Sequence, residues 1–367
     1  MTALDLPVLV FLGGGGVGKT TLAACAGIAA AQRGERAVVL TIDPARRLAS
    51  TLGLDGAGDG GPADAVDLGN EPVLVEGPWP GELWAAMLDP AATLDTALRR
   101  HGGDDQAERI QTNPLFGTIV NTLSGSNEYL AAERLHQLHH DERFDRVVID
   151  TPPARHAIDF LDSPDRLSRF LNNRLYRLVL APRQGLLRPV TSAAQLVMRT
   201  AAKLVGADLV ENVIALFADL DGVEDGFRTR AEETAELLAG ADCGYVIVTS
   251  PRAEPIAEAT WILDRLVGRE RSATAVVVNR LLPFGRQQPS AVPAGVDYQR
   301  AKALVANWEE LAVLSSMEDE VVDALIAELG DDAPTLITVT ERLIPATSVD
   351  DLAELATDLD GGHDPDG

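Results

Sequence analysis

The sequence is poor in cysteine, in lysine and in positive charge overall. It holds two cysteines, Cys25 and Cys243, and three lysines, Lys19, Lys203 and Lys302, while its other basic residues are arginines. Two cysteines so far apart supply no metal-binding framework, and they are typical of a reducing cytosol. The net charge of −25 excludes a general affinity for nucleic acid, because that affinity requires a basic surface.

Long apolar runs are missing as well. No stretch approaches the roughly 18 residues of a membrane-spanning helix, and the first residues lack the positive charge that opens an export signal. We therefore expect a cytoplasmic chain that neither spans a membrane nor is exported. The 46 % of hydrophobic residues is ample for a packed core, and 367 residues fit either two domains or one large α/β domain.

Short runs of Val, Ile and Leu recur along the chain, with helical patterns between them. Continuous runs of this kind are typical of strands buried on both faces of a parallel sheet. The expected strands are Val8–Leu12, Ala37–Ile42, Arg146–Ile149, Tyr245–Thr249, Ala273–Val278 and Leu336–Val339. The first helix is expected over Thr20–Arg33, with Gly34 as its stop. The pattern predicts a doubly wound, mostly parallel α/β fold.

Two long stretches interrupt the alternation, at about 80–142 and 164–240. We interpret both as helical insertions, and within the first we expect helices at Glu82–Met87 and Leu130–His139. Residues 1–360 would then form a single domain. We expect loops at Gly56–Gly69 and Pro283–Val296 and a disordered acidic tail over 361–367.

A glycine-rich motif lies between the first expected strand and the first expected helix. Gly13-x4-Gly18-Lys19-Thr20 matches the P-loop pattern in its required context. Backbone N–H groups can wrap a polyphosphate only where no Cβ intervenes, and the following helix directs its positive end at the anion. We expect Lys19 to reach the β- and γ-phosphates, Thr20 to ligate Mg²⁺ and Thr21 to bond the α-phosphate. The motif predicts a P-loop NTPase that binds ATP.

Three motifs in order resemble those of the ArsA-type anion ATPases and of the guided-entry ATPases for tail-anchored membrane proteins. They are residues 15–21, Leu40–Leu48 and Val148–His156. Together with Gly81–Asp89, Ser126–Tyr129 and Asp159–Asp162, they extend the resemblance over nearly the whole chain, most closely to actinobacterial ArsA-like ATPases. The resemblance implies a dimeric, Mg²⁺-dependent ATPase whose nucleotide-driven switch acts on a protein or membrane-associated client.

The resemblance also assigns roles outside the loop. Asp43, at the end of the second expected strand, would orient or deprotonate the attacking water. Asp150, at the end of the third, would hold Mg²⁺ through water, and residues 151–156 would form the second switch. His156 could equally serve packing. Asn279 matches the position that bonds the adenine, since its amide offers the paired donor and acceptor that a base edge requires, although a strand-end cap is the alternative.

The predicted site can be stated in full. The nucleotide-binding residues are Gly13, Gly14, Gly15, Gly16, Val17, Gly18, Lys19, Thr20, Thr21 and Asn279, and Pro345 would flank the base. The catalytic residues are Asp43 and Lys19. The Mg²⁺ ligands, partly through water, are Thr20, Asp43 and Asp150.

The chain departs from the family pattern at Gly14. Family members carry there a signature lysine, which reaches across a dimer interface to the partner's nucleotide. Apart from Lys19, which belongs to the P-loop itself, no lysine precedes Lys203 to replace it. Three explanations stay open: an arginine substitutes, hydrolysis is slow, or a paralogous ATPase in a heterodimer donates the lysine. A nucleotide-binding regulatory subunit without turnover is the corresponding alternative function.

Residues 164–206 reverse the charge of the rest of the chain. They carry eight basic residues and one acid, Asp165, among many apolar side chains. Basic amphipathic helices suit a hydrophobic client, an acidic partner or a membrane-protein partner, and the alternative is an insertion packed on its own domain. Two distant thiols make an arsenite site unfavourable and no zinc is expected. A partitioning or division-site ATPase is a weaker alternative, because its C-terminal helix would be basic and this C-terminus is acidic.

Overall fold

The computed structural model describes most of the chain and divides it into two compact units. The described residues are 3–43, 47–54, 68–114, 116, 126–171, 212, 215, 219, 222–283, 297–330, 333–342 and 348–360. The sheet unit comprises residues 1–87, 138–158 and 241–367, and the helical unit comprises residues 88–137 and 159–240. The expectation of a single domain over 1–360 stays a prediction.

An eight-stranded sheet forms the sheet unit, in the order β3-β4-β2-β5-β1-β6-β7-β8. All neighbouring strands run parallel except β3, which is antiparallel to β4. The strands are β1 Val8–Gly13, β2 Arg36–Thr41, β3 Val73–Val75, β4 Glu82–Met87, β5 Arg146–Asp150, β6 Cys243–Thr249, β7 Ala275–Leu281 and β8 Thr335–Thr340. The prediction of a doubly wound, mostly parallel α/β fold is confirmed.

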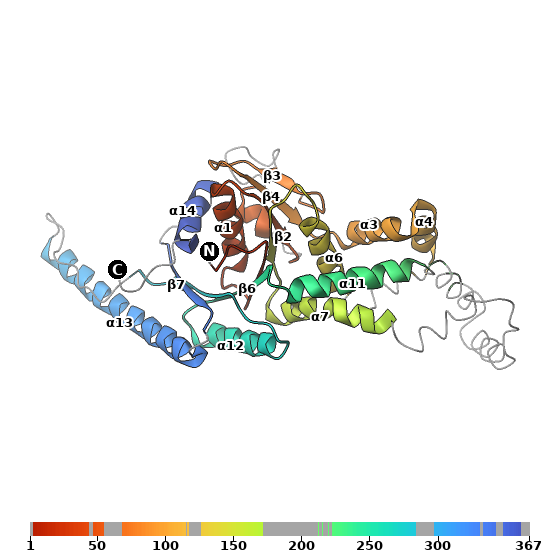
Figure 1. Cartoon of the computed structure of the whole chain (residues 1–367). Coiled ribbons are helices and arrows are strands. Elements are labelled where there is room, and N and C mark those ends of the chain that lie inside the picture. The colour runs from red at the N-terminus through yellow and green to blue at the C-terminus, as the bar shows by residue number, and fades with distance from the viewer. Residues whose placement is uncertain are drawn as a thin grey trace, which may run out of the picture. The chain divides into compact units, whose positions relative to one another are not determined.

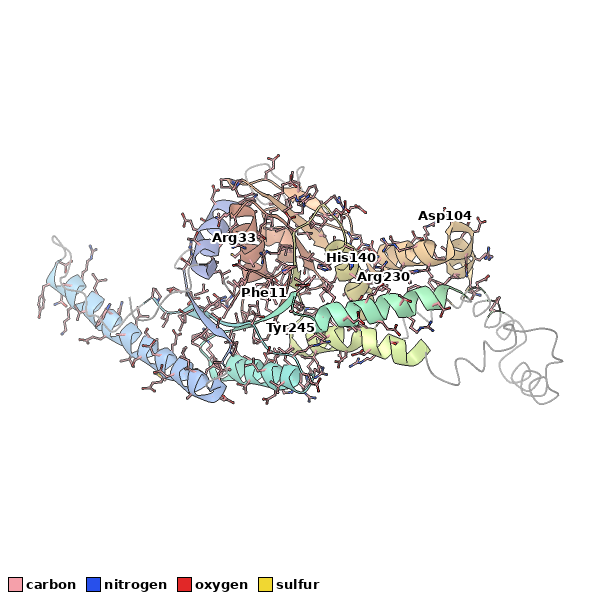
Figure 2. All side chains as sticks on the ribbon, in the orientation of Figure 1. Phe11, Arg33, Asp104, His140, Arg230 and Tyr245 are labelled. Atoms are coloured by element: carbon pink, nitrogen blue, oxygen red, sulfur yellow. The ribbon has the colours of Figure 1, made fainter. Side chains whose placement is uncertain are left out.

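Helices pack around this sheet (Figure 1). Those of the sheet unit are α1 Lys19–Gln32, α2 Arg47–Thr51, α12 Ala253–Val267, α13 Tyr298–Leu329 and α14 Val349–Asp360. α1 is rich in alanine and almost entirely buried, because it lies between the strands and α14. Phe11 of β1 is fully buried at the centre of the unit (Figure 2). Gly34 follows α1 with a φ of +89°, as expected of a helix stop.

One predicted helix is wrong. Glu82–Met87 is strand β4, which pairs with β2 on one side and β3 on the other. Its sequence, Glu-Leu-Trp-Ala-Ala-Met, consists largely of good helix formers. The strand forms because its side chains at Leu83 and Ala85 are completely buried in the core next to β2, and such packing overrides intrinsic propensity.

The helical unit is built from α3 Pro90–Gly102, α4 Asp104–Thr112, α11 Val223–Ala239 and most of α6 Ser126–His139 and α7 Ala154–Leu171. The predicted helix at Leu130–His139 is confirmed as part of α6. A buried polar cluster joins α6 to α11. Arg230 (Figure 2) lies 2.6 Å from Nδ1 of His136 and 3.7 Å from a carboxylate oxygen of Glu133. Burial raises the pKa of Glu133.

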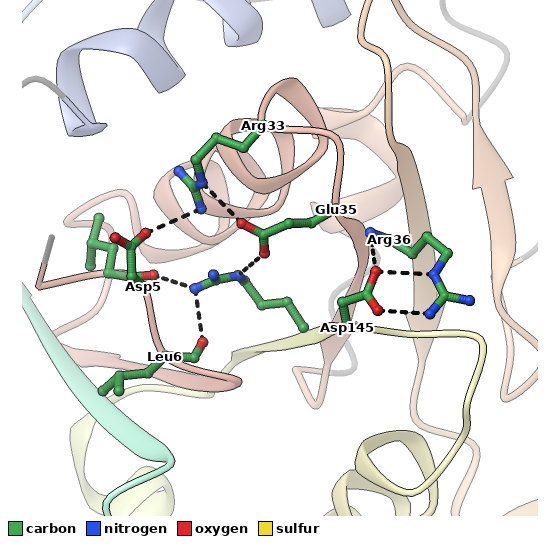
Figure 3. Close-up of polar contacts among 8 residues, drawn as sticks. Asp5, Leu6, Arg33, Glu35, Arg36 and Asp145 are labelled. Carbon is green, nitrogen blue, oxygen red and sulfur yellow. Dashed lines mark hydrogen bonds and ion pairs between the residues drawn. The ribbon is translucent and has the colours of Figure 1, made fainter. Parts of the chain in front are cut away.

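Ion pairs connect the chain at the amino edge of the sheet, where β2 and β5 begin. Arg146, the first residue of β5, pairs with Glu35 at 2.7 Å and donates to the carbonyl oxygen of Leu6 at 2.8 Å (Figure 3). Arg36, the first residue of β2, forms a two-pronged pair with Asp145 at 2.7 and 3.0 Å. The loops that follow the parallel strands lie at the opposite, carboxyl edge of the sheet, and the candidate functional site lies there.

Several sequence-based expectations fall on residues outside the described part. These are the tail 361–367, Pro345, almost all of the loop at Gly56–Gly69, most of the loop at Pro283–Val296, and residues 172–206 of the basic segment. The segment's first residues, 164–171, continue α7. Among the helices described, none combines the length and the apolar character that crossing a membrane would require.

Candidate nucleotide site

The glycine-rich loop joins the last residue of β1 to the first residue of α1. β1 is buried along its whole length, which fixes the loop at the carboxyl edge of the sheet. Gly16 and Gly18 have φ angles of +74° and +99°, in the left-handed region that favours glycine. A Cβ on Gly13 would clash with the carbonyl oxygen of Val248 in β6. The path of the loop therefore requires glycine at all three positions.

Lys19 folds back over this loop. Its Nζ donates hydrogen bonds to the carbonyl oxygens of Gly13 at 3.1 Å and Gly14 at 2.6 Å. The side chain is buried, and burial lowers the pKa of Lys19 while the charges of Asp150 and Asp43 act to raise it. The loop thus holds an ammonium group where the motif predicts phosphate.

Asp150, the last residue of β5, meets two threonine hydroxyls. Its Oδ2 accepts hydrogen bonds from Oγ1 of Thr20 and Oγ1 of Thr41, both at 2.9 Å. Its Oδ1 is buried and finds no hydrogen-bond partner among the described residues. Burial raises the pKa of Asp150 to about 6, although the hydrogen bonds from both hydroxyls act to lower it. The carboxylate is therefore costly to keep charged in this place.

Magnesium fits this arrangement. The ion takes oxygen ligands, and it keeps several waters while binding one or two carboxylates. The unpartnered Oδ1 of Asp150 and the Thr20 hydroxyl are such oxygens. A nearby dication would also offset the cost of burying the Asp150 charge.

A cavity of about 310 Å³ opens beside the loop, within the size range of small-molecule sites. Of the predicted residues it brings together Gly16, Gly18, Lys19, Thr20, Thr21 and Asp43. Asp43 lies two residues beyond the end of β2. Its backbone N–H donates to Oγ1 of Thr41 at 3.3 Å, and its carboxylate lies 3.8 Å from Nη1 of Arg47. Thr41 thus links Asp43 to the hydrogen bonds around Asp150.

Asn279 lies against the loop. Its Nδ2 donates to the carbonyl oxygen of Val17 at 2.8 Å, and its Oδ1 accepts from the backbone N–H of Arg280 at 2.9 Å. A Cβ on Gly18 would clash with the same amide nitrogen. Asn279 therefore braces the loop. Among the described residues, one N–H and one lone pair of its amide have no further partner, and its contact with adenine stays a prediction.

Sequence reasoning gave no role to three residues that shape the site. Thr41 holds Asp150, while Arg47 and Arg280 line the cavity. The sequence contains a signal for Arg47, because it lies four residues after Asp43, a spacing at which an ion pair can form. Arg280 left no such signal: it has a φ of +66° at a bulge where the pairing of β7 and β8 shifts. His156 is exposed at the start of α7, so the packing alternative does not describe it.

Comparison with known proteins decides the family. A family model described as "Anion-transporting ATPase" matches residues 6–316, which is most of the chain. The chain belongs to the anion-transporting ATPase family. The predicted resemblance to this family is confirmed, whereas its closeness to the actinobacterial members stays a prediction. The prediction that the chain is an ATP-hydrolysing enzyme is confirmed with the family.

This anion-transporting ATPase is similar to proteins with two kinds of name. It is 25 % identical over 346 residues to the ATPase GET3C of Arabidopsis thaliana, a match that covers 89 % of this chain and 80 % of that protein. The ATPase GET3B of the same plant is 27 % identical over 339 residues, covering 85 % and 74 %. The arsenical pump-driving ATPase of Acidiphilium multivorum is 27 % identical over 280 residues, covering 73 % of this chain but 43 % of that protein.

Proposed function

We propose that this ATPase binds Mg²⁺ and ATP in the cavity beside residues 13–21 and hydrolyses the nucleotide there. The observation that supports the proposal most is the 2.9 Å hydrogen bond from Thr20, on the loop, to Asp150, at the end of β5. It joins two of the three predicted metal ligands next to the Lys19 ammonium. Magnesium, when bound, neutralises charge on the phosphates.

The chain's own residues divide the remaining work. Lys19 would exchange its two carbonyl partners for phosphate oxygens, which bind an ammonium more strongly because they are charged. Asp43 would orient the attacking water and accept one of its protons. Asn279 would hold the loop in place and offer its remaining amide positions to the base.

We further propose that nucleotide state is transmitted along the chain to the helical unit. Oγ1 of Thr151 donates to the carbonyl oxygen of Phe11 at 2.6 Å, so the segment after β5 is tied to β1 at the cavity. α7 begins at Ala154 and continues without a break into the helical unit. A change at the γ-phosphate that moves residues 151–153 would therefore act on the first turn of that helix.

The quaternary state and the client are inferred from the family resemblance. We propose a homodimer, or a heterodimer with a paralogous ATPase, working in the cytoplasm on a protein or membrane-associated client. The client surface would include the basic segment 164–206, whose described part is the end of α7.

Arsenite is an unfavourable cargo for this chain, in contrast to the pump-driving role that one relative's name states. Both thiols are free and buried, Cys25 within α1 and Cys243 at the start of β6. Burial raises the pKa of both thiols, so neither is a ready thiolate ligand.

Light scattering of the full chain tests the proposed dimer. The Asp43→Asn variant should bind Mg·ATP without turning it over, and so collect in the nucleotide-bound form. We expect its mass in solution to double on adding Mg·ATP, alone or with the co-expressed paralogue, while Lys19→Ala stays unchanged. A nucleotide-saturated Asp43→Asn chain that remains a monomer in both cases would contradict the dimer.

A further inference from the structure

The side chain that lies beside position 14 is an acid rather than a cation. A Cβ on Gly14 would clash with Oε2 of Glu258, whose half-buried side chain comes from α12. The family's signature lysine is absent from this chain, and the Glu258 carboxylate occupies the space that the lysine side chain would enter. Any positive charge that replaces the lysine must come from another place.

The cavity itself carries that charge. Of the described residues that line it, Lys19, Arg47 and Arg280 are cations and Asp43 is the one acid. In a chain with a net charge of −25, this is a local reversal of sign. Anionic substrate would be attracted to such a lining, because charges in a concave site reinforce one another.

The two arginines have different neighbours. Arg280 directly follows Asn279, which contacts the loop at Val17 and Gly18. Arg47 lies beside Asp43, with Nη1 3.8 Å from Oδ2. Arg47 and Lys19 line the same cavity, so the guanidinium shares this space with the Lys19 ammonium. Arg47 therefore shares its part of the cavity with the residues predicted to meet the γ-phosphate.

The Arg47–Asp43 pair is weak enough to be exchanged. Its 3.8 Å separation is too long for a hydrogen bond, and the Arg47 side chain is 62 % exposed. Exposed ion pairs of this kind contribute about 0–1 kcal/mol. A phosphoryl group carries more charge than a carboxylate and matches the planar fork of a guanidinium, so it would compete for Arg47 successfully.

We propose that Arg47 contacts the transferred phosphoryl group and supplies, within the same chain, the positive charge that the signature lysine supplies across the family's dimer interface. In the reaction, water forms the new bond to the γ-phosphorus while the bond to the β,γ-bridging oxygen breaks, and that electron pair stays with ADP. One water proton passes to Asp43 and then to the released phosphate. Arg47 remains protonated throughout and acts by its charge. This inference rests on the proposed function.

Single-turnover hydrolysis by the full chain tests the assignment. Arg47→Ala should slow hydrolysis about 100-fold, as is typical when one cation is removed from the transition state, while the affinity for Mg·ATP changes less than about threefold. Arg47→Lys should recover part of the rate. Arg300→Ala is the matched control, because Arg300 is also an exposed arginine in a weak pair, 3.6 Å from Asp297, but is not among the residues that line the cavity; its rate should stay within about threefold of the unmodified chain. Arg280→Ala should slow hydrolysis less than Arg47→Ala does.

A binding measurement shows whether Arg47 touches phosphate or acts through Asp43. ADP with aluminium fluoride mimics the transferred phosphoryl group, and it should bind at least about tenfold more weakly to Arg47→Ala. The same loss should appear when Arg47→Ala is added to Asp43→Asn, since that background has no Asp43 charge for Arg47 to act upon. Loss of the effect in that background would overturn the direct contact.

Two further outcomes would also overturn the inference. In the first, Arg47→Ala hydrolyses ATP as fast as the unmodified chain. In the second, Arg280→Ala carries the whole loss. Lys19→Ala distinguishes these failures from failure of the proposed function: if it still binds Mg·ATP normally, the site itself is misassigned, whereas loss of binding in Lys19→Ala with no effect of Arg47→Ala refutes the arginine alone.

Discussion

The substitution Asp150→Asn is expected to stabilise the sheet unit at neutral pH and at the same time to abolish Mg²⁺-dependent ATP binding. Asp150 is 1 % exposed, and burial raises its pKa from 3.8 to about 6. Between these values the folded protein keeps a proton that the unfolded chain has lost. Stability therefore falls as the pH rises through this window, and the penalty is complete above about pH 6.

The magnitude follows from the shift. A difference of roughly two pKa units corresponds to about 3 kcal/mol above pH 6, of which about 1.5 kcal/mol develops between pH 5 and pH 7.5. In the variant, the oxygen of the introduced amide could still accept from Thr20 and Thr41. The amide nitrogen would take the place of the unpartnered Oδ1, and an unpaired buried donor costs about 1–3 kcal/mol at every pH. The pH-dependent part survives this offset, because the cost of the amide does not change with pH.

Urea unfolding in the presence of EDTA measures the effect. The four tryptophans, Trp79, Trp84, Trp261 and Trp308, all belong to the sheet unit, so their fluorescence reports on the unit that holds the site. The unfolding free energy of the variant minus that of the unmodified chain should rise by about 1.5 kcal/mol between pH 5 and pH 7.5.

Asp145→Asn is the matched control. Hydrogen bonds from Arg36 lower the pKa of Asp145, so the stabilisation by this carboxylate is present above its unfolded pKa and is lost only as the pH falls through its lower folded value. Its substitution should therefore cost the same at pH 5 and pH 7.5. The reasoning would be refuted if the change in unfolding free energy caused by Asp150→Asn were equally independent of pH, or if this variant kept Mg²⁺-dependent ATP binding.

Three further predictions concern the cavity and the thiols. Asp43→Asn should retain Mg·ATP affinity within about threefold and lose turnover in a single-turnover assay, since it removes the water-orienting carboxylate but not the loop; unchanged turnover would remove that role. Arsenite should not stimulate ATP hydrolysis, whereas a stimulation that disappears in the Cys25→Ser/Cys243→Ser double variant would reverse this view. Gly14→Lys should raise turnover less than about tenfold, because the new lysine would pair with Glu258; a larger gain would show that the missing lysine limits the rate.

Much of the fold was readable from the sequence because its strands are buried on both faces. All six strands expected from continuous apolar runs are present, with ends shifted by up to three residues. The sequence pattern does not predict the short β3, and it predicts a helix where β4 forms. Both lie at one edge of the sheet, where pairing with a neighbour rather than local pattern determines the structure.

The candidate site was readable to the extent that a motif carried it. The loop, Thr20 and Asp150 follow from the P-loop and from an acid at the end of a buried strand, and the structure brings them into contact. Arg280 and Glu258 could not be anticipated, because one depends on a left-handed bulge and the other on how α12 packs beside Gly14. Such relations arise between distant segments and leave no local pattern.

Titration calorimetry of Mg·ATP binding tests the central claim most directly. The account predicts that Lys19→Ala loses affinity by about 100-fold or more, because the buried ammonium on the loop is removed. Lys302→Ala, which removes an exposed lysine on α13, should bind as the unmodified chain does. Equal affinity for all three proteins would contradict the assignment of the nucleotide site to this loop.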